Sequence, residues 1–264
     1  MDEILEIFSD PLVEEVLLQQ GYPICLFRNG KFAISDSTLK QPHSLKDLLH
    51  ELAIASQTRL DYHNPSAGGI MQSGEFRWHC LIPPIVPKPF LSIRRHQFDQ
   101  LAVEDFELSN EEEKKIHSFA FEGKSLVISG PTGSGKTSFM VGILKRYCHK
   151  ERLVIIEQID EIPILSPLWQ KLITSPKDIK GHGGVDSNEL FVHSLRIRPQ
   201  RYVVGEIRSE EAAVFVESTR SGHLGSIATV HAGSLGEAKD KLCELASISQ
   251  EKCGSWEFIQ LPHR

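Results

Sequence analysis

The sequence predicts an α/β protein in two parts: a smaller α+β domain over residues 1–104 and an α/β domain over residues 105–264. In the second part, short apolar strands alternate with amphipathic helices, which is typical of a parallel sheet covered by helices. In the first part, short strands are joined by turns. A mixed polar stretch over 96–108 separates the two parts and predicts a linker.

The composition is that of an ordinary globular protein. Of 264 residues, 40% are hydrophobic and 24% are charged, and the formal net charge of −6 does not favour a protein that coats nucleic acid. The five cysteines are scattered and form no CxxC pair, which argues against a zinc site or a disulfide framework. The sequence has no apolar run long enough to span a membrane, and its N-terminus is acidic, unlike a signal peptide. We therefore expect a cytoplasmic protein.

The first elements of the small domain are indicated by turn and cap residues. Asp10 and Pro11, followed by apolar residues at helical spacing, predict a helix over about 12–17. The dipeptide Asn29-Gly30 between the apolar runs 24–27 and 31–34 predicts a β-hairpin.

The rest of this domain continues the α+β pattern. Ser44 and Asp47 frame the start of another helix. Residues 75–82 alternate partly and predict a strand, and residues 90–95, which follow four prolines, predict an edge strand. Ser109 begins a capping-box pattern for a helix over about 110–121.

A phosphate-binding loop opens the second domain. The strand 125–129 is followed by a GxxxxGK[ST] segment and then by an amphipathic helix, which is the context that this motif requires. Lys136 is expected to bridge the β- and γ-phosphates, and Thr137 to bind Mg²⁺. The candidate nucleotide-binding residues of the loop are Gly130, Pro131, Thr132, Gly133, Ser134, Gly135, Lys136, Thr137 and Ser138. Kinases, helicases and transport motors share this loop, and the lack of an NKxD motif disfavours a GTPase.

Acidic residues follow the next two apolar strands. The strand 152–156 leads to Glu157 and Glu161, and the strand 202–204 leads to Glu206. Because ligands bind at the carboxyl ends of parallel strands, these carboxylates are expected to orient Mg²⁺ or an attacking water. Glu206, with Thr137, is the candidate Mg²⁺ ligand.

Arginines and histidines complete the pattern. Arg196, Arg198 and Arg201 lie within six residues and indicate an anion site, a subunit contact or a surface salt-bridge cluster. His223 and His231 flank the predicted strand 226–230. Their spacing offers no third zinc ligand, so we interpret them as sensors of the nucleotide.

These blocks, in this order, resemble the secretion-motor ATPases of type II and type IV systems. The segment 130–137 matches their Walker A box, 157–161 their Asp box, 202–208 their Walker B box and 221–232 their His box. The segment 195–208, LRIRPQRYVVGEIR, is especially similar to the branch that serves Tad-type pili and conjugal type IV secretion. The resemblance covers roughly residues 10–250.

The resemblance implies a RecA-like C-terminal domain in a homo-oligomeric ring of six subunits. It implies that ATP and Mg²⁺ bind between the two domains of a subunit, with Arg77 and Arg94 reaching the phosphates and Arg95 a close second to Arg94. It also implies docking on inner-membrane proteins at the cytoplasmic face, with peripheral membrane contact and no direct binding of nucleic acid. The residues to which motifs and resemblance together assign catalysis are Lys136, Glu157, Glu161, Arg196, Glu206, Arg208, His223 and His231.

The chain departs from the family pattern in two ways. Gln158 and Gln200 replace aspartates. The region after the His box is shorter than in most members, with one predicted helix over 234–245 and a predicted last strand within 255–264. Two other functions stay open: a nucleic-acid translocase with a RecA-like core, and a nucleotide-binding scaffold without turnover.

Overall fold

The computed structural model describes residues 2–35, 45–56, 58–71, 75–95, 102–175, 183–223, 225–248 and 255–262. The chain divides into two compact units, Met1–Gln97 and Phe98–Arg264, and each is described by itself. Ser44, the predicted helix start, and residues 96–101 of the predicted linker lie outside the described residues.

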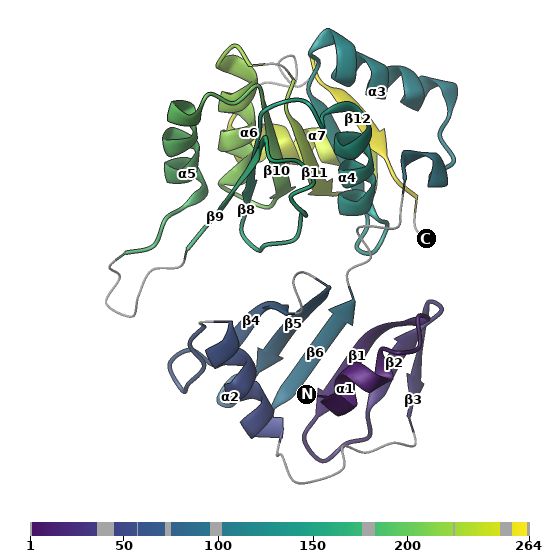
Figure 1. Ribbon diagram of the computed structural model, residues 1–264, viewed down its shortest axis with the longest axis vertical. Coiled ribbons are helices and arrows are strands. Elements are labelled where there is room, and N and C mark those ends of the chain that lie inside the picture. The colour runs from purple at the N-terminus through teal and green to yellow at the C-terminus, as the bar shows by residue number, and fades with distance from the viewer. Residues whose placement is uncertain are drawn as a thin grey trace. The chain divides into compact units, whose positions relative to one another are not determined.

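The N-terminal unit is an antiparallel sheet with two helices over one face (Figure 1). The strand order is β3-β2-β1-β6-β5-β4. Alternate residues of the strands, among them Phe76, Trp78 and Cys80, are buried with residues of both helices in one apolar core. The elements are α1 (Asp2–Ile7), β1 (Val13–Gln19), β2 (Cys25–Arg28), β3 (Lys31–Ile34), α2 (Leu45–Ala55), β4 (Ser66–Met71), β5 (Phe76–Leu81) and β6 (Phe90–Arg95).

The predicted hairpin is confirmed, whereas the predicted helix over 12–17 is wrong. Asn29 and Gly30 both have positive φ, at 51° and 72°, as a tight turn between β2 and β3 requires. Residues 13–19 form β1, and its register shifts between Val13 and Glu15. The irregularity places Val13 and Val16, three positions apart, on the same buried face, and so imitates the spacing of a helix.

The strand over 90–95 forms as predicted, but it is not at an edge. β6 lies in the middle of the sheet, paired with β1 on one side and β5 on the other. The prolines precede the strand and do not interrupt it, so every backbone N–H within β6 can join the ladder.

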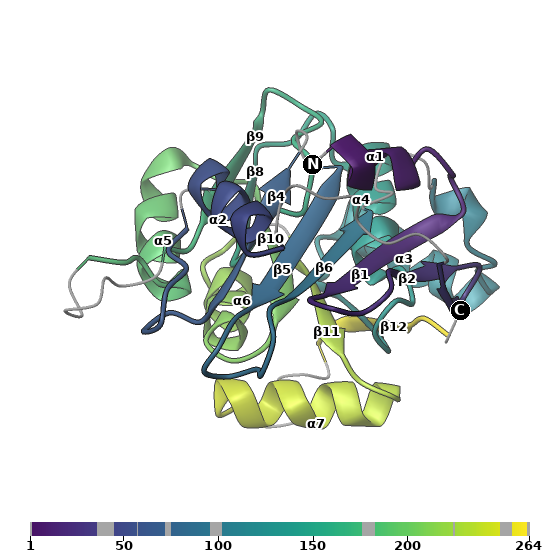
Figure 2. The same cartoon turned by 90° about the horizontal axis from the view of Figure 1, so that it is seen from below.

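The C-terminal unit is a parallel sheet between two layers of helices, with strand order β12-β7-β11-β10-β8-β9. Helices α3 and α4 pack on one face, and α5, α6 and α7 pack on the other (Figure 2). The elements are α3 (Asn110–Glu122), β7 (Leu126–Gly130), α4 (Lys136–Tyr147), β8 (Leu153–Glu157), β9 (Trp169–Ile173), α5 (Ser187–Ser194), β10 (Arg201–Ile207), α6 (Glu211–Arg220), β11 (Ile227–His231), α7 (Leu235–Ala246) and β12 (Glu257–Gln260), with 3₁₀ turns at Val103–Asp105 and Leu195–Ile197.

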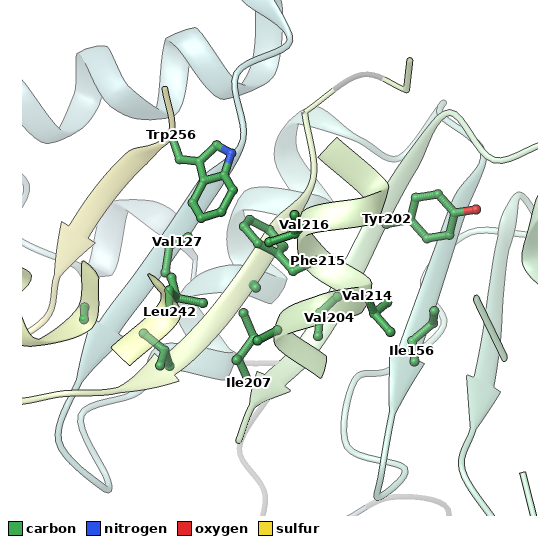
Figure 3. Close-up of a cluster of buried hydrophobic side chains, with 14 of the residues drawn as sticks. Val127, Ile156, Tyr202, Val204, Ile207, Val214, Phe215, Val216, Leu242 and Trp256 are labelled. Carbon is green, nitrogen blue, oxygen red and sulfur yellow. The ribbon is translucent and has the colours of Figure 1, made fainter. Parts of the chain in front are cut away.

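Each central strand of this sheet is apolar on both faces because both faces are covered. In β7, Val127 joins one core, whereas Leu126 and Ile128 join the other. Figure 3 shows the first core, in which Phe215 of α6 lies among side chains of the sheet and near Trp256. No helix among the described residues is long and apolar enough to cross a membrane.

Two of the predicted helix starts, at Ser109 and at residue 234, are confirmed. Ser109 accepts a hydrogen bond from the Glu112 N–H at 3.3 Å, and the Glu112 carboxylate accepts one from the Ser109 N–H at 2.9 Å, which is a complete capping box for α3. Ser234 accepts from the Glu237 N–H at 3.2 Å at the start of α7. The last predicted strand forms as β12, beside β7.

Arg201, one of the three clustered arginines, has a structural role. The residue is only 1% exposed. The guanidinium donates to the carbonyls of Phe119 at 2.8 Å, Ala120 at 2.9 Å and Gly225 at 3.1 Å, and it pairs with Glu151. It thus ties the last turn of α3 to the segment before β11, so the anion site or subunit contact expected of the cluster does not include Arg201.

The close packing around Gly225 predicts a large loss of stability in Gly225→Ala. A Cβ at this position would lie 1.7 Å from the carbonyl oxygen of Lys124, which is backbone and cannot move aside cheaply. Overpacking costs of about 1–3 kcal/mol are usual, and we expect about 3 kcal/mol or more here. Urea unfolding measures the change, with Gly236→Ala on α7 as the control because its nearest neighbour atom is 3.9 Å away. Equal stability of the two variants would contradict the packing described.

Candidate active site

The phosphate-binding loop connects β7 to α4. Gly133 and Gly135 have φ of 78° and 84°, which side-chain-bearing residues rarely adopt, and Gly135 is the N-cap of α4. Ser134 is 1% exposed, and its hydroxyl has no hydrogen-bond partner among the described residues. The first N–H groups of α4 have no partner within the helix by geometry. A buried orphan hydroxyl beside such a helix start fits an anionic phosphate ligand.

Lys136 lies folded against its own loop. Its Nζ donates to the carbonyls of Gly130 at 2.9 Å and Pro131 at 2.7 Å, and it lies 3.3 Å from Nδ1 of His231. Burial lowers the pKa of Lys136 to about 8, although the nearby Glu206 carboxylate acts in the opposite direction. The ammonium is therefore held in a poorly solvated place, where a phosphate would be a better partner than carbonyl oxygens.

His231 joins Lys136 to Glu206. Its Nε2 lies 2.9 Å from Glu206 Oε1. Burial and the charge of Lys136 lower the pKa of His231, so the ring is neutral at pH 7. A neutral ring that accepts from Lys136 at Nδ1 must donate from Nε2 to Glu206, an assignment inferred from the hydrogen-bond network.

Glu206 sits at an irregularity in β10. Val204 pairs with Ala228 and Ile207 with Val230, so β10 has one residue more than β11 in this stretch. Such a bulge redirects side chains. Arg208 completes the group, with its guanidinium 2.5 Å from Glu206 Oε2. Glu206 is therefore held between His231 and Arg208.

Glu157 ends β8 and is 5% exposed. Its carboxylate accepts from the Ile162 N–H at 3.1 Å and lies 3.7 Å from Nζ of Lys171. Burial raises the pKa of Glu157 to about 8, against the opposing effect of Lys171. A Cβ at Gly205 would be 2.9 Å from Glu157 Cγ, so this glycine makes room for the glutamate side chain.

The structure brings the segment 157–161 at the end of β8, here called the acidic loop, together with the end of β10. A small open pocket is lined by Glu157, Glu161, Glu206 and Arg208, together with Gln158, Ile159 and Gly205. The pocket lies at the carboxyl ends of β8 and β10, as the sequence predicts for the ligand edge of a parallel sheet.

Arg196 and His223 are not brought into this group. Arg196 is exposed in the 3₁₀ turn before β10, and His223 packs edge-on against Tyr202, near the amino end of β10, with ring centroids 5.1 Å apart. Five residues of strand, about 17 Å, separate Arg201 from Glu206. The side chains of Arg196 and His223 therefore lie near the amino ends of the strands, whereas Lys136 lies near their carboxyl ends.

The N-terminal arginines occupy two different faces of their sheet. Arg77 and Arg94 are register partners on neighbouring strands, opposite the face that carries Trp78. Like charges in directly opposite positions on neighbouring strands repel each other, and an anion bound beside both would reduce that repulsion. Arg95 points the other way, where it donates to the carbonyls of Phe8 and Asp10 and lies over the Phe8 ring.

Four residues of the site were not expected from the sequence. Thr229 donates to the Gly205 carbonyl at 2.6 Å, and Lys241 of α7 donates to the His231 carbonyl at 3.1 Å. Lys171 comes from β9, and Glu211 begins α6. Only Glu211 had a signal in the sequence, the acidic pair Glu210-Glu211 two residues after the motif 202–208, and this signal does not distinguish Glu211 from Glu210. The other three come from unremarkable positions.

The residues present fit a magnesium site only in part. No group of three or more His, Cys, Asp or Glu within the described ranges is arranged to hold a metal by itself. Thr137 and Glu206 would supply two oxygen ligands, and Mg²⁺ at nucleotide sites commonly takes its remaining ligands from phosphates and water. The donor set thus suits a metal that arrives with a nucleotide.

Comparison with known families identifies the chain. The family described as type II/IV secretion system protein matches residues 71–259, more than half of the chain. The chain belongs to this family. Similar proteins include the conjugal transfer protein TrbB of Rhizobium radiobacter, 27% identical over 95% of this chain and 77% of the relative. The protein VirB11 of the same organism is 27% identical over 93% of this chain and 80% of the relative.

Solved structures support the fold of this type II/IV secretion family member. The Legionella pneumophila ATPase DotB matches with a TM-score of 0.62 at 18% identity, over 96% of this chain and 71% of that one. The pilus retraction motor PilT matches with a TM-score of 0.61 at 17% identity, over 92% of this chain and 71% of that one. The predicted RecA-like α/β fold class is confirmed.

The buried carboxyl of Glu157 predicts a distinct dependence of stability on pH. Its pKa is raised from 4.5 to about 8, so the folded state keeps a proton that the unfolded chain releases, and stability falls as the pH rises from about 4.5 to 8. Between pH 5 and 8 the wild type is expected to lose on the order of 3 kcal/mol of stability through this carboxyl, and Glu157→Gln is expected to abolish that loss.

Urea unfolding of wild type and Glu157→Gln at both pH values measures the difference, with the exposed Glu244→Gln as control. Parallel stability curves for wild type and Glu157→Gln would contradict the burial of a protonated carboxyl.

Proposed function

We propose that this chain is an ATP-hydrolysing motor of a type IV secretion, conjugation or pilus-assembly machine. The observation that carries the proposal is the continuous chain Lys136–His231–Glu206, which joins the phosphate-binding loop to the acidic end of β10. The names of the relatives, a conjugal transfer protein and VirB11, support the setting in a secretion or conjugation machine.

The roles of the residues in hydrolysis follow from their chemistry. The loop 130–138 encloses the phosphates with N–H groups, and Lys136 exchanges its carbonyl partners for phosphate oxygens. His231 and Arg208 hold the Glu206 carboxylate in one orientation, which suits it to position a water or a metal-bound ligand. Mg²⁺, carried on Thr137 and Glu206, would neutralise charge on the phosphates.

Glu157 and Glu161 supply the second set of oxygens beside Glu206. Below about pH 8 Glu157 carries a proton and can donate a hydrogen bond, and above that pH it is a base. The open pocket that these carboxyls line is the place we assign to the attacking water. Glu161 adds negative charge next to Arg208, which helps to keep that arginine in place.

Arg77 and Arg94 are proposed to contact the phosphates from the N-terminal unit, so that ATP binds between the two units of a subunit. Their neighbouring positions on one sheet face support an anion ligand. Arginines that hold the γ-phosphate lose this partner on hydrolysis, and domain motion then follows the nucleotide state.

We further propose a ring of six subunits that docks on inner-membrane proteins at the cytoplasmic face. This part rests on the resemblance of the motifs. Arg196 and His223 lie towards the far edge of the sheet from Lys136, so any contact that they make with a nucleotide would be with that of a neighbouring subunit.

Lys136→Ala tests the proposal directly. We expect ATP hydrolysis to fall by about a hundredfold or more, because the lysine supplies charge to the transition state. The control is Lys145→Ala, an exposed lysine of the same helix, and phosphate release is the measurement. Hydrolysis at the wild-type rate in Lys136→Ala would refute the proposal, tight ATP binding without release in wild type would favour a scaffold, and strong stimulation by DNA or RNA would favour a translocase.

The arginines of β6 give a second test. Arg94→Ala is expected to raise the KM for ATP by about tenfold, which is the effect of losing one charge-assisted contact, and to leave the melting temperature unchanged. Arg95→Ala is expected to lower the melting temperature because it frees the carbonyls of Phe8 and Asp10. The reverse pattern would show that Arg95, and not Arg94, reaches the nucleotide.

A further inference from the structure

Glu211 is a buried carboxylate to which three segments of the site converge. It is 2% exposed and is the first residue of α6. Its Oε1 accepts from Gln158 Nε2 at 2.6 Å and from Ser187 Oγ at 3.2 Å. Its Oε2 accepts from the N–H groups of Ser209 at 3.0 Å and Arg208 at 3.2 Å. These donors belong to the acidic loop, to the start of α5 and to the turn after β10.

This environment favours an ionised carboxylate. Burial would raise the pKa of Glu211, but the hydrogen bonds from Ser209, Arg208 and Gln158 outweigh it and hold the pKa below its ordinary value. The position at a helix N-terminus acts in the same direction. Glu211 is therefore a charged acceptor for all four donors.

The two sides of the proposed site are joined through this carboxylate. Gln158 directly follows Glu157, and Arg208 contacts Glu206. The catalytic carboxyls Glu157 and Glu206 thus come from loops that share one buried acceptor. We propose that Glu211 is a positioning residue for the proposed hydrolysis. Its side chain holds the acidic loop and the turn after β10 in fixed positions relative to Glu206.

The same contact accounts for glutamine at position 158. The side-chain amide of Gln158 donates to Glu211, which a carboxylate of the same length could not do without a proton. The departure from the family pattern at this position therefore supplies a hydrogen bond in this chain.

The test exchanges the two side chains and rests on the proposed ATPase function. Gln158→Glu sets two carboxylates against each other, and we expect kcat to fall about tenfold, the low end for a hydrogen bond to a charged group, with little change in KM. Glu211→Gln alone is expected to lower kcat about threefold, since the side-chain amide of Gln158 can flip and accept a hydrogen bond from the new amide.

The double variant Gln158→Glu with Glu211→Gln restores a donor facing an acceptor. In it, the amide introduced at position 211 can donate to the new carboxylate and still accept from the two backbone N–H groups. Because a donor again faces an acceptor, we expect kcat of the double variant to return to within about threefold of wild type. The four variants together form a cycle that measures the coupling of the two side chains. Gln158→Ala, which removes the donor without adding charge, should not be rescued by Glu211→Gln. Glu210→Gln, the exposed neighbour, is the control.

The outcomes separate the two proposals. A double variant whose loss is the product of the single losses, in an enzyme whose wild type hydrolyses ATP, would overturn the positioning role of Glu211 alone. The positioning role would also be overturned if Gln158→Glu and Glu211→Gln lowered the melting temperature without any change in kcat. Absence of hydrolysis in the wild type would overturn the proposed function, and the inference with it.

Discussion

The parallel pairing of β7, β11 and β10 is the constraint on which the site depends. In this register His231 is the partner of Gly130, the first glycine of the phosphate-binding loop. The ring nitrogens of His231 can therefore reach Lys136 on one side and Glu206 on the other. The bulge in β10 turns Glu206 to meet the ring, and Thr229 takes up the Gly205 carbonyl at this irregularity. One register thus assembles three motifs that are far apart in the sequence.

The site is also an electrostatic balance. Lys136 and Glu157 are both buried, and burial moves the pKa of each to about 8, downwards for the lysine and upwards for the glutamate. Each group is thus close to a change of charge near neutral pH, where a new ligand has a large effect. Glu211 differs from Glu157 because four donors satisfy it, so it can stay ionised although it is buried.

The structure also sorts arginines that look alike in the sequence. Arg94 and Arg95 are neighbours, but successive side chains of a strand point to opposite faces of the sheet. Arg95 therefore lies on the face that carries the apolar core, and Arg94 lies beside Arg77 on the other face. Arg201 is buried by its contacts with α3, whereas Arg196 is exposed in a 3₁₀ turn. Residue type and spacing are therefore insufficient to distinguish a phosphate ligand from a structural arginine.

Most of the C-terminal fold and the chemistry of its loops could be predicted from short-range patterns. The strand, glycine loop and helix around Lys136, the acids after β8 and β10, and the caps at Ser109 and Ser234 depend on neighbours in the chain. Long-range contacts were needed to turn residues 13–19 into a bulged strand, to place β6 inside its sheet, to separate His223 from His231 and to recruit Lys171 and Glu211. Register, bulges and burial arise from pairing between distant segments, which local periodicity does not encode.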